Sequence, residues 1–165
     1  MKAYSDLDLP KSGIKFIGTG DIVTDEELQG MGDVTLGVTT VHHYSASSDR
    51  PANKAFVAAY KKEFGADLNP GFMVVAAWDA MDAIFAAIRE QGGKVDPDKS
   101  MEFFKKWKST TSPRGTFSID PETRDVVNPE YLREVRKVGG KLVNVEIETV
   151  GVAVKDPMKE ADKKK

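Results

Sequence analysis

The chain has 165 residues, of which 40% are hydrophobic and 30% charged, and its formal net charge is −2. Such a chain forms one globular domain or parts of two, and it carries no basic footprint for binding nucleic acid. It contains no cysteine, which excludes disulfides and thiol chemistry, and residues 1–13 lack the apolar core of a signal peptide.

The first predicted unit is half of an α/β motif. Residues 1–12 resemble the end of a helix with nothing before it to pack against, and 13–18 (GIKFIG) predict a short strand. A loop at Thr19–Asp21 follows the strand, and a capping box from Thr24 to Glu27 starts a short helix. In open α/β sheets the ligand crevice lies outside the carboxyl ends of the strands, which makes this loop a candidate site.

The same loop raises the question of a dinucleotide fingerprint. Gly18 and Gly20 have the required spacing, but Val23 stands where the third glycine belongs. The nucleotide hypothesis is therefore not adopted.

Residues 33–45 (DVTLGVTTVHHYS) predict a second strand that ends in both histidines of the chain. Adjacent residues of a strand point to opposite faces, so His42 and His43 are not expected to share a metal ion. A polar strand end with one ring half buried is the favoured interpretation. Tyr44 is the residue expected to present an aromatic face to a cleft.

Two helices follow the polar loop at 45–50. Residues 51–64 have aromatic residues every fourth position and predict an amphipathic helix. Residues 69–93 (NPGFMVVAAWDAMDAIFAAIREQGG) predict a longer one, with Asn69 as cap, Pro70 at the first position and Gly92 as stop. Because apolar residues cover most of its circumference, we expect this central helix to be buried on more than one side.

Asp79 and Asp82 lie three residues apart on the central helix and share a face. A carboxylate pair for acid–base chemistry is one interpretation. The favoured one is a polar stripe on an otherwise apolar helix, because no partner base accompanies the two carboxylates.

A third helix is predicted from Asp96 or Asp98 to Lys108, followed by a strand at 116–120. Residues 131–138 and 141–150 then predict a β-hairpin around Gly139 and Gly140. In its second strand valines and isoleucine alternate with polar residues, so we expect the apolar set to face the core. That apolar set comprises Val143, Val145 and Ile147, and the polar set Asn144, Glu146 and Glu148.

This order of elements gives an α/β chain whose central helix needs a sheet that the chain does not contain. We therefore expect either a partner chain or a longer protein around it. No catalytic signature such as GxSxG, HExxH, CxxC or a P-loop is present.

Four stretches carry a resemblance to a known family. They are GIKFIGTGD with its EEL helix, HYS with PANKAFVAAYKKEFG, WDAM at 78–81, and SPRGTFSIDPETRDVVNPEYLREV with GGKLVNVE. Together they resemble the carboxyl-terminal half of type I periplasmic solute-binding proteins, the leucine/isoleucine/valine-binding class of ABC transporters. The likeness covers nearly all of residues 3–157 and is greatest to the branch that often takes aromatic or small organic acids.

The resemblance implies a partial type I periplasmic-binding-protein fold with three-layer αβα lobes, carboxyl-terminal portion only. Residues 1–46 would belong to the second lobe, 47–120 to the first, and 121–155 to the second again, with 156–165 a flexible tail. It further implies a periplasmic location, a small-molecule ligand, an ABC permease as partner, no cofactor, and a missing amino-terminal half or a second copy as cover.

The resemblance also assigns the expected ligand contacts. Amino-acid binders place a carboxylate for the ligand's ammonium group near Gly20, where this chain has Asp21 adjacent, so an amino-acid ligand is in doubt. An aromatic contact would come from Phe72, and weaker contacts from Thr19, His43 and Tyr44. Two alternatives stay open, an α/β enzyme using Asp79 and Asp82 or His43, and a sensory ligand-binding domain of a regulator.

Overall fold

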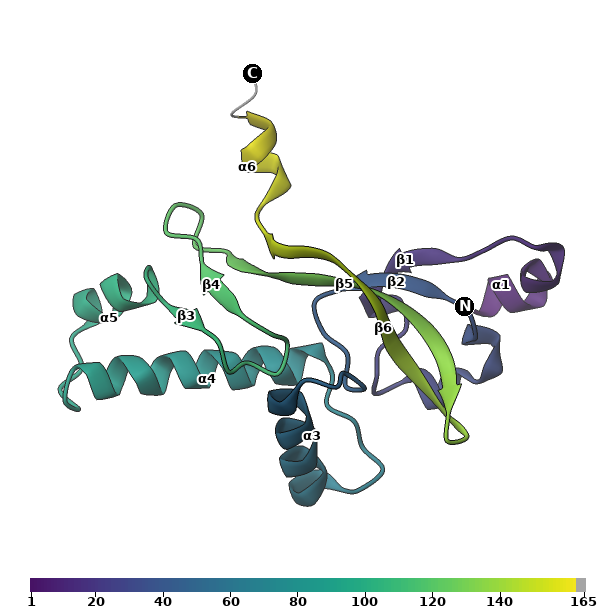
Figure 1. The fold of residues 1–165 in the computed structure, drawn as a ribbon, viewed down its shortest axis with the longest axis horizontal. Coiled ribbons are helices and arrows are strands. Elements are labelled where there is room, and N and C mark those ends of the chain that lie inside the picture. Colours follow the sequence, from purple (N-terminus) through teal and green to yellow (C-terminus); the bar gives the residue numbers. More distant parts are fainter. Residues whose placement is uncertain (163–165) are drawn as a thin grey trace.

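The computed structural model describes residues 1–162, which form a mixed α/β structure (Figure 1). Among these residues there are six strands in one sheet. The strands are β1 (Ile17–Thr19), β2 (Thr39–His42), β3 (Lys108–Ser109), β4 (Phe117–Ile119), β5 (Val126–Val138) and β6 (Lys141–Val154). The helices are α1 (Lys2–Asp6), α2 (Leu28–Met31), α3 (Pro51–Phe64), α4 (Phe72–Glu90), α5 (Pro97–Phe104) and α6 (Pro157–Asp162), with 3₁₀ turns at Leu9–Ser12, Gly20–Ile22 and Asp33–Thr35.

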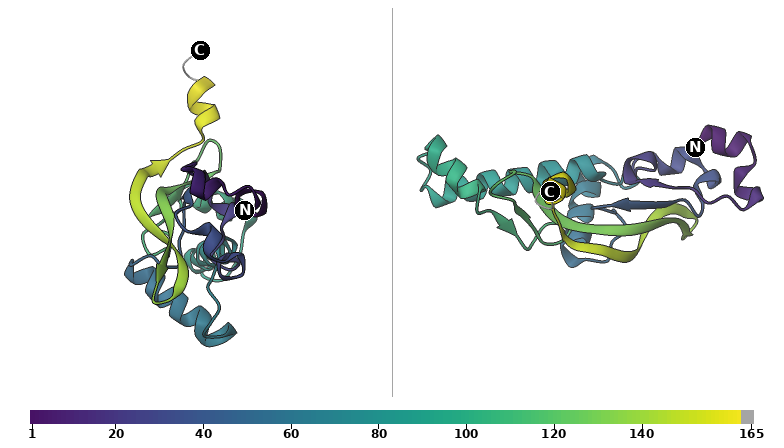
Figure 2. Two further views of the ribbon diagram at one scale, coloured as in Figure 1. Left: turned by 90° about the vertical axis from the view of Figure 1, so that its right-hand side faces the viewer. Right: turned by 90° about the horizontal axis from the view of Figure 1, so that it is seen from above.

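A long hairpin connects two blocks of structure. β5 and β6 pair along almost their whole length, and the other edge of β5 pairs with β4 near its start and with β2 in its middle. β1 adds to β2 in parallel, and β3 adds to β4. We call β1, β2, α1, α2 and the turn end of the hairpin the strand block, and α3, α4, α5, β3 and β4 the helical block. The view from above shows the β5–β6 ribbon along one side of the molecule and α4 on the other (Figure 2).

Each block has a small apolar core of its own. In the strand block, Val23, Leu28 and Val38 pack against Val135 and Leu142 of the hairpin. The second cluster joins Phe56 of α3 and Val75 of α4 to Tyr44 from the segment after β2. The two clusters hold the segments on either side of the β2 strand end.

The central helix begins later than its sequence indicates. Gly71 occupies the cap position, so the predicted cap at Asn69 and first-turn Pro70 are wrong. Pro70 is buried instead, in the segment leading to α4. The predicted stop is confirmed, because Gly92 has a φ of 59° and the N–H of Gly93 bonds the carbonyl of Ile88, as in a Schellman motif.

The faces of the hairpin are the reverse of the predicted ones. On β6 the buried side chains are Leu142 and Asn144, whereas Val143 and Val145 are half-buried and Ile147 is 41% exposed. The reason lies across the strand block, where Asn144 Nδ2 donates to the carbonyl of Val23 at 3.0 Å and to Asp25 Oδ1 at 3.1 Å. Asn144 therefore points inward because buried hydrogen-bond partners are available to it there.

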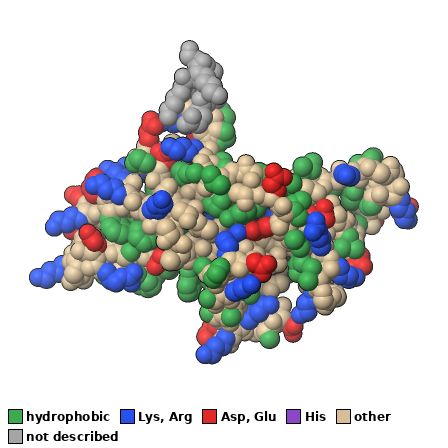
Figure 3. Space-filling view, in the orientation of Figure 1, with side chains coloured by type: hydrophobic (Ala, Val, Ile, Leu, Met, Phe, Trp, Pro, Cys, Tyr) green, Lys and Arg blue, Asp and Glu red, His purple; other side chains and the backbone are tan. Residues whose placement is uncertain are grey.

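Much of the apolar surface of α4 is uncovered. Val75, Ala83 and Ala87 are buried, but Trp78 is 51% exposed and Phe85 49%. Hydrophobic side chains reach the surface over α3, α4 and the hairpin (Figure 3). The expectation that α4 packs on more than one side is not met within the described residues.

Other expected elements differ in extent. The predicted strands at 13–18 and 33–45 are reduced to β1 and β2, and the predicted helix to Lys108 ends at Phe104. Within the expected flexible tail, 156–165, residues 157–162 form α6, and 163–165 lie outside the described residues. None of the described helices is both long enough and apolar enough to cross a membrane.

Candidate ligand-binding site

The carboxyl ends of the two parallel strands meet at one edge of the sheet. β1 and β2 run in register from Ile17 opposite Thr39 to Thr19 opposite Val41. The Thr19–Asp21 loop after β1 therefore lies beside the histidines that end β2. This is the edge at which open α/β sheets bind ligands.

Arg133 holds this edge together from the neighbouring strand. Its Nη1 donates to the carbonyl of Tyr44 at 2.6 Å, its Nη2 to the carbonyl of Gly20 at 3.1 Å, and its Nε to Thr40 Oγ1 at 3.2 Å. The side chain is 2% exposed, with Asp25 Oδ2 at 4.0 Å. One buried guanidinium thus fixes the backbone after both strands.

Gly20 is at this position because no side chain fits there. An added Cβ would lie 2.3 Å from His42 Cγ and 2.5 Å from Arg133 Nη2. The backbone of the loop consequently touches the imidazole directly. The sequence marks this position as a candidate contact, and the structure gives it a packing requirement.

The two histidines and Phe72 form an aromatic cluster next to the loop. The rings of His42 and His43 stack with centroids 4.3 Å apart, and Phe72 meets them edge-on at 4.9 Å and 6.0 Å. The prediction that the two histidines point to opposite faces is wrong. Strand geometry ends at His42, so the alternation does not extend to His43.

Both imidazoles are neutral at physiological pH. Burial, followed by the charge of Arg133, lowers the pKa of His42 to about 4. Burial, followed by His42 and Arg114, lowers the pKa of His43 to about 3. A neutral imidazole can both donate and accept a hydrogen bond, which suits a hydroxyl-bearing ligand.

The carboxylate of the loop itself, Asp21, is solvated. Asp21 is exposed, and a hydrogen bond from Thr19 is the main reason why its pKa is lowered. Glu26 lies against the start of α4, since a Cβ on Gly71 would fall 1.5 Å from its Oε1. Thr19 itself is exposed at the strand end.

Tyr44 does not present its ring to this surface. It is fully buried, its hydroxyl donates to Asn53 Oδ1 at 3.0 Å, and burial raises the pKa of the phenol. Its expected role as an aromatic cleft contact is corrected to a core role. The physical reason is the apolar cluster with Phe56 and Val75, which encloses the ring.

Asp79 belongs to a buried ion pair, and the predicted polar stripe is wrong. It is 6% exposed, and its Oδ2 accepts from Arg114 Nε at 2.7 Å and from Ser112 Oγ at 3.0 Å. Burial raises the pKa of this carboxyl against the opposing effect of Arg114. Because its carboxylate is held by Arg114 and Ser112, Asp79 is a poor candidate for proton transfer together with Asp82.

The sequence reasoning missed Arg133, Arg114 and Asp25. A usable signal existed for the first, because Tyr131, Arg133 and Val135 share one face of β5 and the outer two are large and apolar. Asp25 gave none, since it stands inside the capping box. Burial raises the pKa of Asp25 to about 6.

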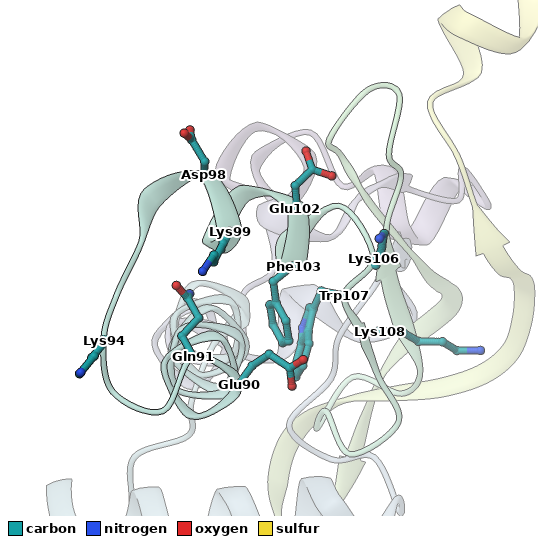
Figure 4. A pocket seen from close by; sticks show the side chains of 10 residues that line it. All are labelled: Glu90, Gln91, Lys94, Asp98, Lys99, Glu102, Phe103, Lys106, Trp107 and Lys108. Atoms are coloured by element: carbon teal, nitrogen blue, oxygen red, sulfur yellow. The ribbon is translucent and has the colours of Figure 1, made fainter.

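Two hollows lie in the helical block, away from this edge. One of about 980 Å³ opens between the carboxyl end of α4, α5 and β3. Its lining has positively charged lysines and negatively charged carboxylates around Phe103 and Trp107 (Figure 4). The other, of about 390 Å³, lies between α3 and α4 and is lined chiefly by apolar side chains such as Trp78. Within residues 1–162, no cluster of three or more His, Asp or Glu side chains is suited to a metal ion.

Comparison with known proteins identifies the family to which the chain is similar. The family model described as periplasmic binding protein matches residues 1–141. The Leu/Ile/Val-binding protein homolog 6 of Brucella abortus is 41% identical over 152 residues, which are 90% of this chain and 38% of that protein. The chain therefore spans about two fifths of the length of this relative.

Solved structures give the same result. A solute-binding protein of an ABC transporter from Rhodopseudomonas palustris BisB5, in complex with 3,4-dihydroxybenzoic acid, is 50% identical with a TM-score of 0.88 over 96% of this chain and 43% of its own. A second one, from strain HaA2 in complex with p-hydroxybenzoic acid, is 42% identical with a TM-score of 0.84, covering 93% of this chain and 41% of its own. A Brucella ovis protein that binds leucine and other amino acids shares the fold at 18% identity and a TM-score of 0.74 over 94% of this chain and 41% of its own.

Proposed function

The chain belongs to the periplasmic binding protein family, and on that premise we propose that it is the part of a solute receptor that contacts an aromatic carboxylic acid. The receptor would present this ligand to an ABC permease in the periplasm. Two observations together carry the proposal. The chain is 50% identical to the solute-binding protein in complex with 3,4-dihydroxybenzoic acid, and the strand edge presents Phe72 and two stacked imidazoles.

The composition of the edge favours an aromatic ligand over an amino acid. Phe72 and the stacked imidazoles offer ring edges and faces, which suit a flat aromatic ring. The neutral nitrogens of His42 and His43 suit a phenolic hydroxyl. Of the expected contacts, Thr19, Asp21, His43 and Phe72 stay in the proposal as side chains and Gly20 as backbone, while His42 is added and Tyr44 is dropped.

An amino-acid ligand is the second candidate. Asp21 is ionised and exposed beside the loop, so it could pair with an ammonium group. The curated relatives at 41% identity are named for leucine, isoleucine and valine binding. In a sensory role the same site would bind the same ligand, but the protein that recognises the ligand-bound form would be a regulator instead of a permease.

The lobe assignment is also a proposal. The strand block with residues 1–46 and the hairpin would form one wall of the cleft, and the helical block with residues 47–120 would form part of the other lobe. The separation of the two blocks along β5 supports this division. The amino-terminal part found in the longer relatives, or a second copy of this chain, would cover the apolar surface of α4.

The histidine signals give a direct test on the chain itself. Nuclear magnetic resonance would follow the Cε1–H signals of the chain's two histidines while 3,4-dihydroxybenzoate, 4-hydroxybenzoate, benzoate or leucine is added. We expect millimolar affinity, because a single wall leaves much of the ligand in water. Aromatic acids should shift both signals and leucine neither. Shifts with leucine alone would favour the amino-acid candidate, and micromolar binding would contradict the single-wall account.

A further inference from the structure

Arg114 is a buried guanidinium with unused donors. Its side chain is 7% exposed and, among the described residues, donates a single hydrogen bond, from Nε to Asp79 Oδ2 at 2.7 Å. Among residues 1–162, neither Nη1 nor Nη2 of Arg114 makes a hydrogen bond. Its backbone is fixed on both sides, by Ser112 Oγ at 3.2 Å and by the Tyr131 hydroxyl at 2.8 Å.

Two other arginines show what a purely structural role looks like in this molecule. Arg50 donates from Nη1 and Nη2 to the two carboxylate oxygens of Glu146 at 2.7 and 2.8 Å. Arg133 uses all three of its side-chain nitrogens on carbonyls and Thr40. Arg114 is bound to its carboxylate through Nε alone, which leaves the outer edge of the fork free.

That free edge is not sealed inside the protein. Within the described part of the chain, the polar side-chain atoms that are both fully enclosed and without a partner are Trp107 Nε1 and Asn144 Oδ1. The Nη atoms of Arg114 are not among them, so the small exposed part of this side chain includes them. The outer edge of the guanidinium therefore keeps a small contact with solvent.

The ion pair of Arg114 and Asp79 lies on the side of α4 that carries Phe72. Asp79 lies seven residues after Phe72 and on the same side of α4, about 10 Å along the helix axis. Tyr131, which holds the Arg114 carbonyl, is the register partner of His42 on β5. The charge of Arg114 also contributes to the low pKa of both histidines, which places it within electrostatic reach of them.

We propose that Arg114 binds the carboxylate of the ligand, with its two Nη groups facing the two carboxylate oxygens. This inference rests on the proposed function and names the group that recognises the charged end of the ligand. A planar guanidinium matches a carboxylate with two parallel hydrogen bonds, which a lysine cannot reproduce. Asp79 orients the fork through Nε without occupying its outer edge.

The ligand itself provides the sharpest test, because it leaves the protein unchanged. The full chain is titrated with 4-hydroxybenzoate and with 4-hydroxybenzamide, its uncharged counterpart, while the histidine Cε1–H and Arg114 side-chain signals are followed. The expected result is a loss of affinity of about tenfold or more for the amide, with Arg114 signals moving for the acid only.

Variants then distinguish carboxylate binding by Arg114 from a purely structural role of this residue. Arg114→Gln paired with Asp79→Asn avoids an unpaired buried carboxylate and should bind the acid and the amide equally. Arg136→Gln, an exposed change, should keep the preference for the acid.

The outcomes separate the two proposals. Equal affinity of the unaltered chain for the acid and the amide would contradict carboxylate binding by Arg114, but it would not contradict the proposed binding of an aromatic ligand. No response to either compound would remove the proposed function and carboxylate binding by Arg114 with it. The comparison of the two compounds decides even if the double variant fails to fold.

Discussion

At the scale of single residues, the site depends on a close approach between backbone and side chains. Gly20 lies against His42 and Arg133 without room for a methyl group, and the two imidazoles stack on each other beside Phe72. Burial makes these imidazoles neutral. Both features lead to predictions that can be checked without knowing the ligand.

Gly20→Ala should destabilise the fold by about 1–3 kcal/mol, because the methyl group must displace His42 or Arg133 from their packed positions. Urea denaturation measures the change in the free energy of unfolding. Gly30→Ala is the matched control, since nothing lies within 4 Å of the added methyl in helix α2. There alanine should be neutral or stabilising by about 0.5–1 kcal/mol. Equal effects of the two substitutions would contradict the close approach at Gly20.

Acidification should weaken the fold through the two histidines. Their pKa values fall from 6.5 in the unfolded chain to about 4 and about 3, so the unfolded chain binds more protons between pH 6.5 and pH 4. Their contribution to stability is complete above pH 6.5 and declines as the pH falls through that window.

Asp25 acts in the opposite direction, and the measurement must separate the two effects. Its pKa is raised to about 6, so the folded chain binds its proton more tightly than the unfolded chain between about pH 4 and 6. Urea denaturation at pH 7.5, 6.5 and 5.5 should therefore compare the unaltered chain with His42→Gln/His43→Gln. The free-energy difference between them should shrink as the pH falls. A constant difference would show that the histidines are not buried as described.

At the scale of elements, the strand edge is organised from β5. The inward series Tyr131, Arg133 and Val135 supplies a hydroxyl, a guanidinium and an apolar side chain to three different neighbours. Arg133 ties the ends of β1 and β2 to this strand. The hairpin thus positions the loop and the histidines as well as connecting the two blocks.

Arg133→Met should cost about 3–5 kcal/mol of folding free energy, because it leaves two carbonyls buried without their donor and removes the positive charge 4.0 Å from the buried Asp25 carboxyl. Arg136→Met is the control on the same strand, where an exposed ion pair with Glu134 is lost. That change should stay within about 0.5 kcal/mol. Chemical denaturation of both variants tests the contrast, and similar losses would argue against an organising role for Arg133.

Local elements could be predicted where their signals are local. The helix at 51–64, the stop at Gly92, the Asp96 cap and the Gly139–Gly140 turn follow from spacing and turn chemistry, and the structure confirms all four. The hairpin faces could not be predicted, since Asn144 points inward only because Val23 and Asp25 lie opposite. Such partners come from more than a hundred residues away in the sequence.

The site was predictable to the same degree. The rule about strand ends made the loop at Thr19–Asp21 a candidate and the family resemblance did so for Phe72, and the structure places Phe72 against the histidines that end β2. The stacking of His42 on His43, the enclosure of Tyr44 and the roles of Arg114 and Arg133 depend on where distant segments meet. No spacing within the sequence carries that information.

At the scale of the whole molecule, the chain leaves apolar surface uncovered beside the candidate site, which we propose to be one wall of a cleft. Trp78, Phe85 and the hollow between α3 and α4 stand open, while the relatives are more than twice as long as the matched region. We therefore propose that this chain sets the ligand preference and that high affinity requires a second wall.

A chimaera tests that central claim most directly. This chain would replace the matched 43% of the Rhodopseudomonas palustris BisB5 receptor, with which it is 50% identical, and calorimetry would measure binding of 3,4-dihydroxybenzoate, 4-hydroxybenzoate and leucine. We predict a folded chimaera that binds the aromatic acids at least a hundredfold more tightly than the chain alone and does not bind leucine. A folded chimaera that binds leucine, or that binds none of the three, would contradict it.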